Sequence, residues 1–206
     1  MPATSALPLL STNAGKKFFG SVDYIYMNIV AISGSLRKGS YNTMLVKAMA
    51  SLAPAGMQIE IAEIGNLPLY NYDDEATFPV AVQALKDKIK KADGVIIATP
   101  EYNRSIPGVL NNAIDWLSRP YGKNSFVKKP VLLAGVSSGK IGTAVAQSQV
   151  RVTLLYLEAD IIGQPELYLG PAKDIFDEAG NITNDSTKEL LTKALCVLAK
   201  RVDGTV

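Results

Sequence analysis

The stretch "MNIVAISGSLRKGSYN", residues 27–42, passes from a run of apolar residues into a loop of glycine, serine and basic residues. Its first part, "NIVAI" at residues 28–32, is almost continuously apolar, as expected of a strand buried on both faces of a parallel sheet. Sheets of this kind commonly bind phosphate groups in the loop that follows their first strand. The ligand of this loop therefore decides the function of the chain.

The rest of the chain alternates between strand patterns and apolar residues at helical spacing. Further strands are expected at residues 58–64, 94–100, 130–138 and from 159 into an irregular stretch that ends at 169. Helices are expected at residues 44–52, 82–92, 107–117, 142–157 and 186–198. Pro107 suits the first turn of its helix, and Ser186 with Glu189 predicts a capping box for the last. Strands alternating with helices predict βαβ units and a parallel sheet covered on both faces.

Length and charge set limits on the class of protein. The 206 residues suggest one domain, expected at residues 27–206, with residues 1–26 as a flexible extension before the first strand. A net charge of +2 does not indicate a nucleic-acid partner. No apolar stretch reaches the roughly 18 residues that a membrane span needs, so no membrane partner is expected. We expect a cytoplasmic protein.

The chain contains no histidine and a single cysteine. A Ser-His-Asp triad, a Cys-His pair, a His-ligated zinc site and an internal disulfide are therefore excluded. If the chain is an enzyme, a cofactor or carboxylate, lysine and tyrosine groups must supply its chemistry. Cys196 is expected to be a buried structural thiol on the apolar side of the last helix.

The loop after the first strand matches neither of two well-known phosphate loops. Gly34 and Gly39 have the spacing of a Walker A loop, but Ser40 and Tyr41 stand where that motif needs lysine and serine or threonine. A dinucleotide fingerprint would need glycine in place of Leu36. Both interpretations fail, because residues that each motif needs to bind its phosphates are absent.

A compact anion site remains. The Arg37 guanidinium can bind two phosphate oxygens, and Ser35 and Ser40 offer hydroxyls. Asn42 is expected to cap the helix and to reach the ligand, beside the free N–H groups of the helix start. This donor set suits one terminal phosphate monoester. The alternative is an ordinary turn with a solvated Arg37–Lys38 pair.

Two further loops follow strands three and four. In "PEYNRSIPG" (100–108), Tyr102 can form an aromatic wall, and the N–H groups of Glu101, Tyr102 and Asn103 can face the polar edge of a planar ring. The alternative is a structural turn with Tyr102 packed on the surface. In "SSGKIGTA" (137–144), small residues permit close approach to a planar ligand, although this stretch equally fits a strand-to-helix turn at Gly142 and Thr143.

The stretches "GSLRKGSYN" and "TPEYNRSIPGVLNNAIDWLSR", about 60 residues apart, together closely resemble the NADPH-dependent FMN reductase family, which includes quinone and chromate reductases. The resemblance spans roughly residues 27–200. It implies a flavodoxin-like three-layer sandwich, with a five-stranded parallel sheet in the order 2-1-3-4-5. It also implies bound FMN, with NADPH or NADH as co-substrate.

The resemblance also assigns residues to the flavin. It places the phosphate at Ser35, Arg37, Ser40, Tyr41 and Asn42. It places the ring at Pro100, Glu101, Tyr102, Asn103, Ser137, Ser138 and Gly139. Arg104 stays open between a solvated residue and a contact to the NADPH phosphate. No side chain is expected to act as a catalytic acid or base, because the hydride passes to the N5 atom of FMN.

The expected function is transfer of two electrons from NAD(P)H, through bound FMN, to a small-molecule acceptor. Quinones, free flavin, azo compounds and chromate are the acceptors that the family suggests. The alternatives are an FMN electron carrier without NAD(P)H turnover and a flavin-free regulatory protein. A pI near 8.5, one tryptophan and an arginine in the phosphate loop favour the reductase over the carrier.

Several conspicuous residues are not assigned to the site. Trp116 is expected in the core or at a dimer interface. The adjacent acids Asp73, Asp74 and Glu75 are expected to be solvated rather than to bind a metal. Relatives suggest a homodimer or homotetramer, with subunit contacts at Arg151, Tyr156 and Glu166.

Overall fold

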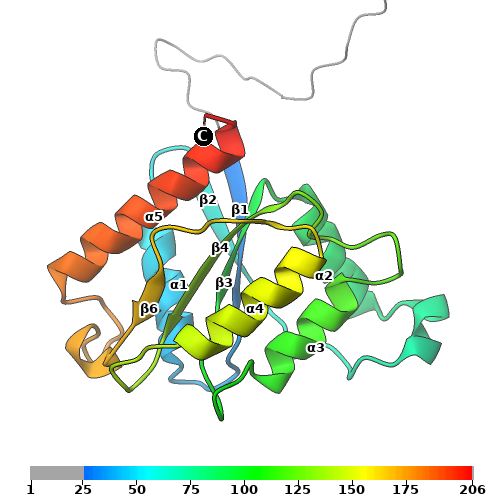
Figure 1. Ribbon diagram of the computed structural model, residues 1–206, viewed down its shortest axis with the longest axis horizontal. Coiled ribbons are helices and arrows are strands. Elements are labelled where there is room, and N and C mark those ends of the chain that lie inside the picture. The colour runs from blue at the N-terminus through cyan, green and yellow to red at the C-terminus, as the bar shows by residue number, and fades with distance from the viewer. Residues whose placement is uncertain (1–25, 206) are drawn as a thin grey trace, which may run out of the picture.

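A parallel β-sheet with helices on both faces forms the centre of the computed structural model, which describes residues 26–205 (Figure 1). The strands are β1 Met27–Ser33, β2 Met57–Ala62, β3 Gly94–Ala98, β4 Pro130–Val136, β5 Asp160–Ile161 and β6 Leu167–Leu169. Their order is β2-β1-β3-β4-β5, with β6 also paired to β4. The expected fold class and strand order are confirmed.

The helices cover the two faces of the sheet as layers. They are α1 Tyr41–Ser51, α2 Val80–Lys91, α3 Gly108–Leu117, α4 Ala144–Tyr156 and α5 Asp185–Asp203, with short 3₁₀ helices η1 Tyr72–Thr77 and η2 Ala172–Asp174. Residues of α1 and α5 share one buried apolar cluster, and residues of α2, α3 and α4 share the other (Figure 1). The central strands must therefore be apolar on both faces, which explains the buried run Ile29–Ile32.

The carboxyl ends of β1, β3 and β4 lie at one edge of the sheet. The three strands are parallel neighbours, with Ile29 in register with Gly94 and Val95 with Val131. The loops that follow them therefore come together at this edge, at the bottom of Figure 1. Gly135 permits the close packing of β4 here, since a Cβ on it would lie 1.9 Å from the Thr143 hydroxyl oxygen.

The last third of the chain differs from the expected pattern in two places. The expected fifth strand is interrupted: β5 and β6 both pair with β4, and Gly163 and Pro165 lie between them. Proline has no N–H to donate to a sheet, so pairing resumes only at β6. The expected capping box is wrong, because Asn184 caps α5 by accepting a hydrogen bond from the Thr187 N–H.

The expectation of a flexible extension falls on residues that, except for Tyr26, lie outside the described range. Within residues 26–205, none of the helices combines the length and the apolar character that crossing a bilayer requires.

Candidate functional site

The loop between β1 and α1 gathers polar donors at the start of α1. Ser40 caps the helix, since its hydroxyl accepts a hydrogen bond from the Thr43 N–H at 3.3 Å. The Ser35 and Ser40 side chains are buried, whereas Arg37 is exposed and lies 5.3 Å from the Tyr41 ring centroid. Among the described residues, no acid forms an ion pair with Arg37. A free guanidinium and two hydroxyls at a helix N-terminus suit a phosphate group.

Asn42 has a different role from the one expected for its side chain. The expected cap is wrong, because Ser40 occupies that position. The buried Asn42 amide instead donates to the Val136 carbonyl and accepts from the Val136 N–H, both at 3.0 Å. Asn42 therefore ties the start of α1 to the end of β4 and fixes the spacing between two of the loops.

A two-residue hairpin turn shapes the loop between β3 and α3. Tyr102 and Ser105 exchange backbone hydrogen bonds of 3.2 and 2.9 Å, and Asn103 and Arg104 have φ angles of 53° and 58°. Left-handed backbone at both central positions is typical of a type I′ turn. The Tyr102 N–H is therefore not free to face a ring, contrary to expectation. For Glu101 and Asn103, the described part of the chain offers no acceptor to the backbone N–H.

Glu101 joins this loop to helix α4. One carboxylate oxygen accepts hydrogen bonds from the N–H groups of Val145 and Ala146, at 3.0 and 3.1 Å. The other oxygen pairs with Arg104 at 3.0 Å. These two N–H groups belong to the first turn of α4, whose own N-cap residue, Thr143, makes no side-chain cap. The carboxylate thus satisfies free donors at the positive end of a helix.

Gln149 adds a second connection between α4 and the same loop. Its amide oxygen accepts from the Ser105 hydroxyl at 2.9 Å and from the Ile106 N–H at 3.4 Å. Its amide nitrogen donates to the Arg104 carbonyl at 3.0 Å. Gln149 was not predicted, because a polar residue inside a helix gives no signal of which distant loop it contacts.

The loop after β4 is ordered by its own hydrogen bonds. The Ser137 hydroxyl accepts from the Gly139 N–H at 3.2 Å and donates to the Gly139 carbonyl at 3.1 Å. Gly142 has φ of 68°, and a Cβ there would lie 2.6 Å from the Tyr168 backbone, so it forms a structural turn. Thr143 is buried, and its hydroxyl accepts from the Gln147 amide at 2.9 Å. Gly142 and Thr143 thus fit the turn interpretation.

The three loops meet around one cavity of about 170 Å³. The hydroxyls of Ser35 and Tyr102 lie 3.3 Å apart and join the first two loops across it. The predicted residues that line it are Ser35, Arg37, Ser40, Tyr41, Asn42, Pro100, Glu101, Tyr102, Ser137 and Ser138. Val136 also lines it and was not predicted, whereas the predicted Asn103 and Gly139 do not line it. The fold thus brings together residues from three separate parts of the sequence.

The structure shows the surroundings of two residues that were not assigned to the site. Trp116 is fully buried, and its indole N–H donates to the Pro68 carbonyl at 2.9 Å, as a core residue should. The expectation for Cys196 is wrong, because this thiol is exposed. It follows the buried Leu195 directly, and one residue turns a helix by about 100°, which carries Cys196 off the buried face.

The acids of η1 are not all solvated. Glu75 accepts a hydrogen bond from the Tyr70 hydroxyl at 2.6 Å and lies 3.6 Å from Arg119. This hydrogen bond, helped by burial, raises the pKa of Tyr70 above its ordinary value. Glu75 therefore holds the segment before α2 in place.

Comparison with known proteins identifies the family of this chain. The family model described as NADPH-dependent FMN reductase matches residues 27–174. The chain belongs to this family. The 2-hydroxy-1,4-benzoquinone reductase of a Burkholderia species is 45% identical over 165 residues, 80% of this chain and 90% of that protein. The quinone reductase of Escherichia coli is 41% identical over 173 residues, 82% of this chain and 92% of that protein.

A solved structure agrees with this assignment. FerB of Paracoccus denitrificans, described as a flavoenzyme NAD(P)H:(acceptor) oxidoreductase, superposes with a TM-score of 0.81 at 37% identity. The match covers 86% of this chain and 98% of FerB. The protein is therefore an oxidoreductase that uses FMN with NAD(P)H as co-substrate. The electron-carrier alternative is not favoured.

Proposed function

We propose that the 170 Å³ cavity holds the phosphate end of FMN. The observation that carries this proposal is Arg37, an exposed guanidinium without an acid partner in the described structure, beside the buried hydroxyls of Ser35 and Ser40. The backbone N–H groups of Tyr41 and Asn42, in the first turn of α1, add donors at the positive end of the helix dipole. The residues present therefore fit the phosphate.

The ring of FMN would lie against the two other loops. Tyr102, half exposed beside the cavity, supplies the aromatic wall. The free N–H groups of Glu101 and Asn103 can donate to the polar edge of the ring, while the small residues at 137–139 permit close approach. Asn103 and Gly139 stay in this assignment although they do not line the cavity.

The size of the cavity supports a reductase. Typical ligand pockets measure roughly 300–1,000 Å³, so a cavity of about 170 Å³ encloses only part of a flavin. The ring would then lie at the open side, where a nicotinamide and an oxidised acceptor can reach it in turn. When bound, FMN would supply hydride acceptance from NAD(P)H and two-electron transfer to an acceptor. The loops of the chain would hold its ring in place and stabilise the charge that develops there.

Quinones are the acceptors that we propose first. Curated relatives at 41–45% identity carry the name quinone reductase or 2-hydroxy-1,4-benzoquinone reductase. Chromate, azo compounds and free flavin are further acceptors for the same open ring. Arg104, whose exposed side chain lies beside this opening, would attract the phosphate of NADPH.

A homodimer or homotetramer is also proposed. The outward face of α4 carries Val152, Leu155 and Tyr156, exposed by 68, 72 and 79%, and Val145, the second residue of the helix, is also exposed. A helix face of this kind is normally polar when it faces water. A second copy of the chain would cover it, and because Glu101 and Gln149 tie α4 to the ring loop, assembly would also steady that loop. Sedimentation velocity of wild type and of Leu155→Lys tests this proposal.

The test of the function is anaerobic reduction of the FMN-loaded protein. NADPH or NADH is added while the visible absorbance of the flavin is followed, and then a benzoquinone is added. We expect rapid bleaching by a nicotinamide and rapid recovery with the quinone. Bound flavin that neither nucleotide bleaches would indicate an electron carrier, and a protein that takes up no FMN would refute the assignment of the cavity.

A further inference from the structure

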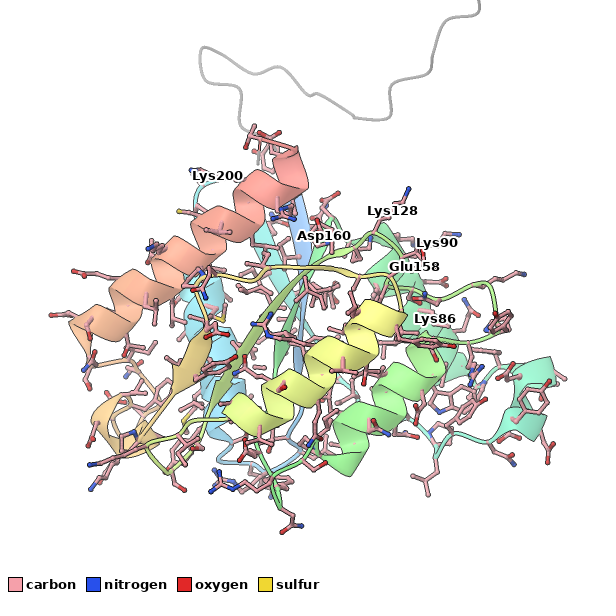
Figure 2. All side chains as sticks on the ribbon, in the orientation of Figure 1. Lys86, Lys90, Lys128, Glu158, Asp160 and Lys200 are labelled. Carbon is pink, nitrogen blue, oxygen red and sulfur yellow. The ribbon has the colours of Figure 1, made fainter. Side chains whose placement is uncertain are left out.

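A second cavity, of about 740 Å³, lies between α2, the end of η1 and the loop before β4. Its walls share no residue with the flavin cavity. Lys90 stands in the last turn of α2 and Lys129 directly precedes β4, so the cavity reaches the amino-terminal edge of the sheet. Figure 2 shows Lys86 and Lys90 on the right of the molecule, above the loops at the bottom.

Four lysines line this cavity, Lys86, Lys90, Lys123 and Lys129, together with two acids. Both acids form contacts with residues other than the four lysines. Glu75 accepts from Tyr70 and pairs with Arg119, and Asp87 accepts from the Gln83 amide at 2.9 Å. Within residues 26–205, none of the four lysines forms an ion pair. Four positive and two negative side chains leave an excess of two positive charges.

Lys86 is the most constrained of the four. Its ammonium donates to the carbonyls of Leu117 and Lys123 at 3.1 and 3.3 Å and to the Ser125 hydroxyl at 3.2 Å. Burial lowers its pKa to about 8, although the carboxylates of Asp87 and Glu75 act in the opposite direction. The three hydrogen-bond acceptors of Lys86 are neutral oxygens and no carboxylate of the described residues pairs with it directly, so a bound anion would give this ammonium an ion-pair partner.

The other lysines divide into one fixed and two free side chains. Lys129 donates to the backbone carbonyls of Ala92 and Lys90. Lys90 and Lys123 are exposed, and within the described structure their ammonium groups make no hydrogen bond. The fixed ammonium groups can set the position of an anion, while the free ones can close on it. Phe78, whose ring centroid lies 5.8 Å from the Lys86 nitrogen, adds an aromatic wall.

We propose that this lysine cavity binds a phosphorylated small molecule that carries at least two negative charges. A volume of about 740 Å³ falls within the roughly 300–1,000 Å³ of small-molecule sites. Lysines act as point charges and suit phosphate oxygens, whereas planar carboxylates favour the fork of arginine. The excess of two positive charges is enough to neutralise a phosphate group, which carries close to two negative charges near neutral pH.

The test is calorimetric titration of the FMN-loaded protein with pyrophosphate and, separately, with ADP. FMN keeps the phosphate loop occupied, so that binding there appears as flavin release. The variant Lys90→Ala/Lys123→Ala removes two charges that make no structural contact. We expect it to weaken binding by at least about tenfold, since each charge-assisted hydrogen bond is worth that much. Lys47→Ala, an exposed lysine beside a different cavity, should bind as wild type does.

A second readout follows from Lys86. Near pH 8, binding of an anion should raise the pKa of this lysine, so that the protein takes up a proton from the buffer. The measured heat of binding should therefore differ between buffers that have different ionisation enthalpies. Tighter binding of ADP than of pyrophosphate would indicate an organic ligand on the Phe78 wall, and equal binding an inorganic one. Absence of binding, release of FMN, or undiminished binding by the double variant would each overturn the proposal.

Discussion

The side-chain amide of Asn42 forms two hydrogen bonds of 3.0 Å with the backbone of Val136, a residue 94 positions away in the sequence. This pair connects the start of α1 with the end of β4, the strand that precedes the third loop. Both residues also line the cavity that we propose for the phosphate end of FMN. This buried polar contact thus helps to set the geometry of the site.

Replacement of Asn42 by alanine should lower the free energy of unfolding by about 2–6 kcal/mol. The substitution leaves the Val136 N–H and carbonyl without their partner, and each buried polar group without one costs about 1–3 kcal/mol. Urea unfolding of the apo protein measures the change. Asn111→Ala, at an exposed position of α3, should leave the stability nearly unchanged. Equal stabilities of the two variants would contradict the proposed role.

The carboxylate of Glu101 should matter for stability as well as for the flavin. Its side chain is only 7% exposed, so solvent screens its interaction with the start of α4 poorly. We expect Glu101→Gln to cost about 0.5–1 kcal/mol and Glu101→Ala about 1–2 kcal/mol, the usual range for helix-end charges and caps. Thermal and urea unfolding test this order. Glu63→Ala, an exposed acid, is the control; a loss as large as that of Glu101→Ala would refute the assignment.

Replacement of Arg37 by alanine should weaken FMN binding. A charge-assisted hydrogen bond to phosphate is worth about 1.5–3 kcal/mol, which corresponds to a roughly 10- to 150-fold higher dissociation constant. Quenching of flavin fluorescence on binding gives the constant directly. Lys38→Ala removes the same charge one residue away, from a side chain that does not line the cavity, and should change affinity far less. Unchanged affinity in Arg37→Ala would mean that the phosphate lies elsewhere.

Much of the architecture could be predicted because it rests on local patterns. The buried run Ile29–Ile32 and the apolar strands β3 and β4 follow from a sheet covered on both faces. The loops at the carboxyl ends of these strands then had to come together, and they carry ten of the twelve predicted site residues into one cavity. The local sequence patterns and the overall topology agree here, so the topology could be predicted from the patterns.

The parts that could not be predicted depend on contacts between distant residues. The bonds of Glu101 to α4 and of Asn42 to β4 join positions more than 40 residues apart. The capping box failed for a different reason: Asn184, two residues upstream, starts the helix earlier, so that Ser186 lies inside α5 and donates its own hydroxyl to Asn184. A spacing rule identifies a possible cap but does not choose between two neighbouring ones.

Lys86 should make stability depend on pH in the alkaline range. Its pKa is lowered from 10.5 to about 8 in the folded protein because of burial. Between these values the unfolded chain binds more protons than the folded one, so a rise in pH favours the folded state. The free energy of unfolding of wild type, relative to Lys86→Met, should therefore rise as pH increases from about 8 towards 10.5. Below pH 8 the difference in the free energy of unfolding between the two proteins should not change with pH.

Denaturant unfolding at a series of pH values measures this difference. Ser125→Ala removes one hydrogen-bond partner of Lys86 but keeps the amine. The free energy of unfolding of this variant, relative to Lys86→Met, should therefore rise with pH as that of wild type does. Other groups that titrate in this range, such as Tyr70, are common to all three proteins and cancel in the comparison. A difference that stays level, or that falls as pH increases, would show that the Lys86 ammonium is well solvated and that burial does not destabilise its charge.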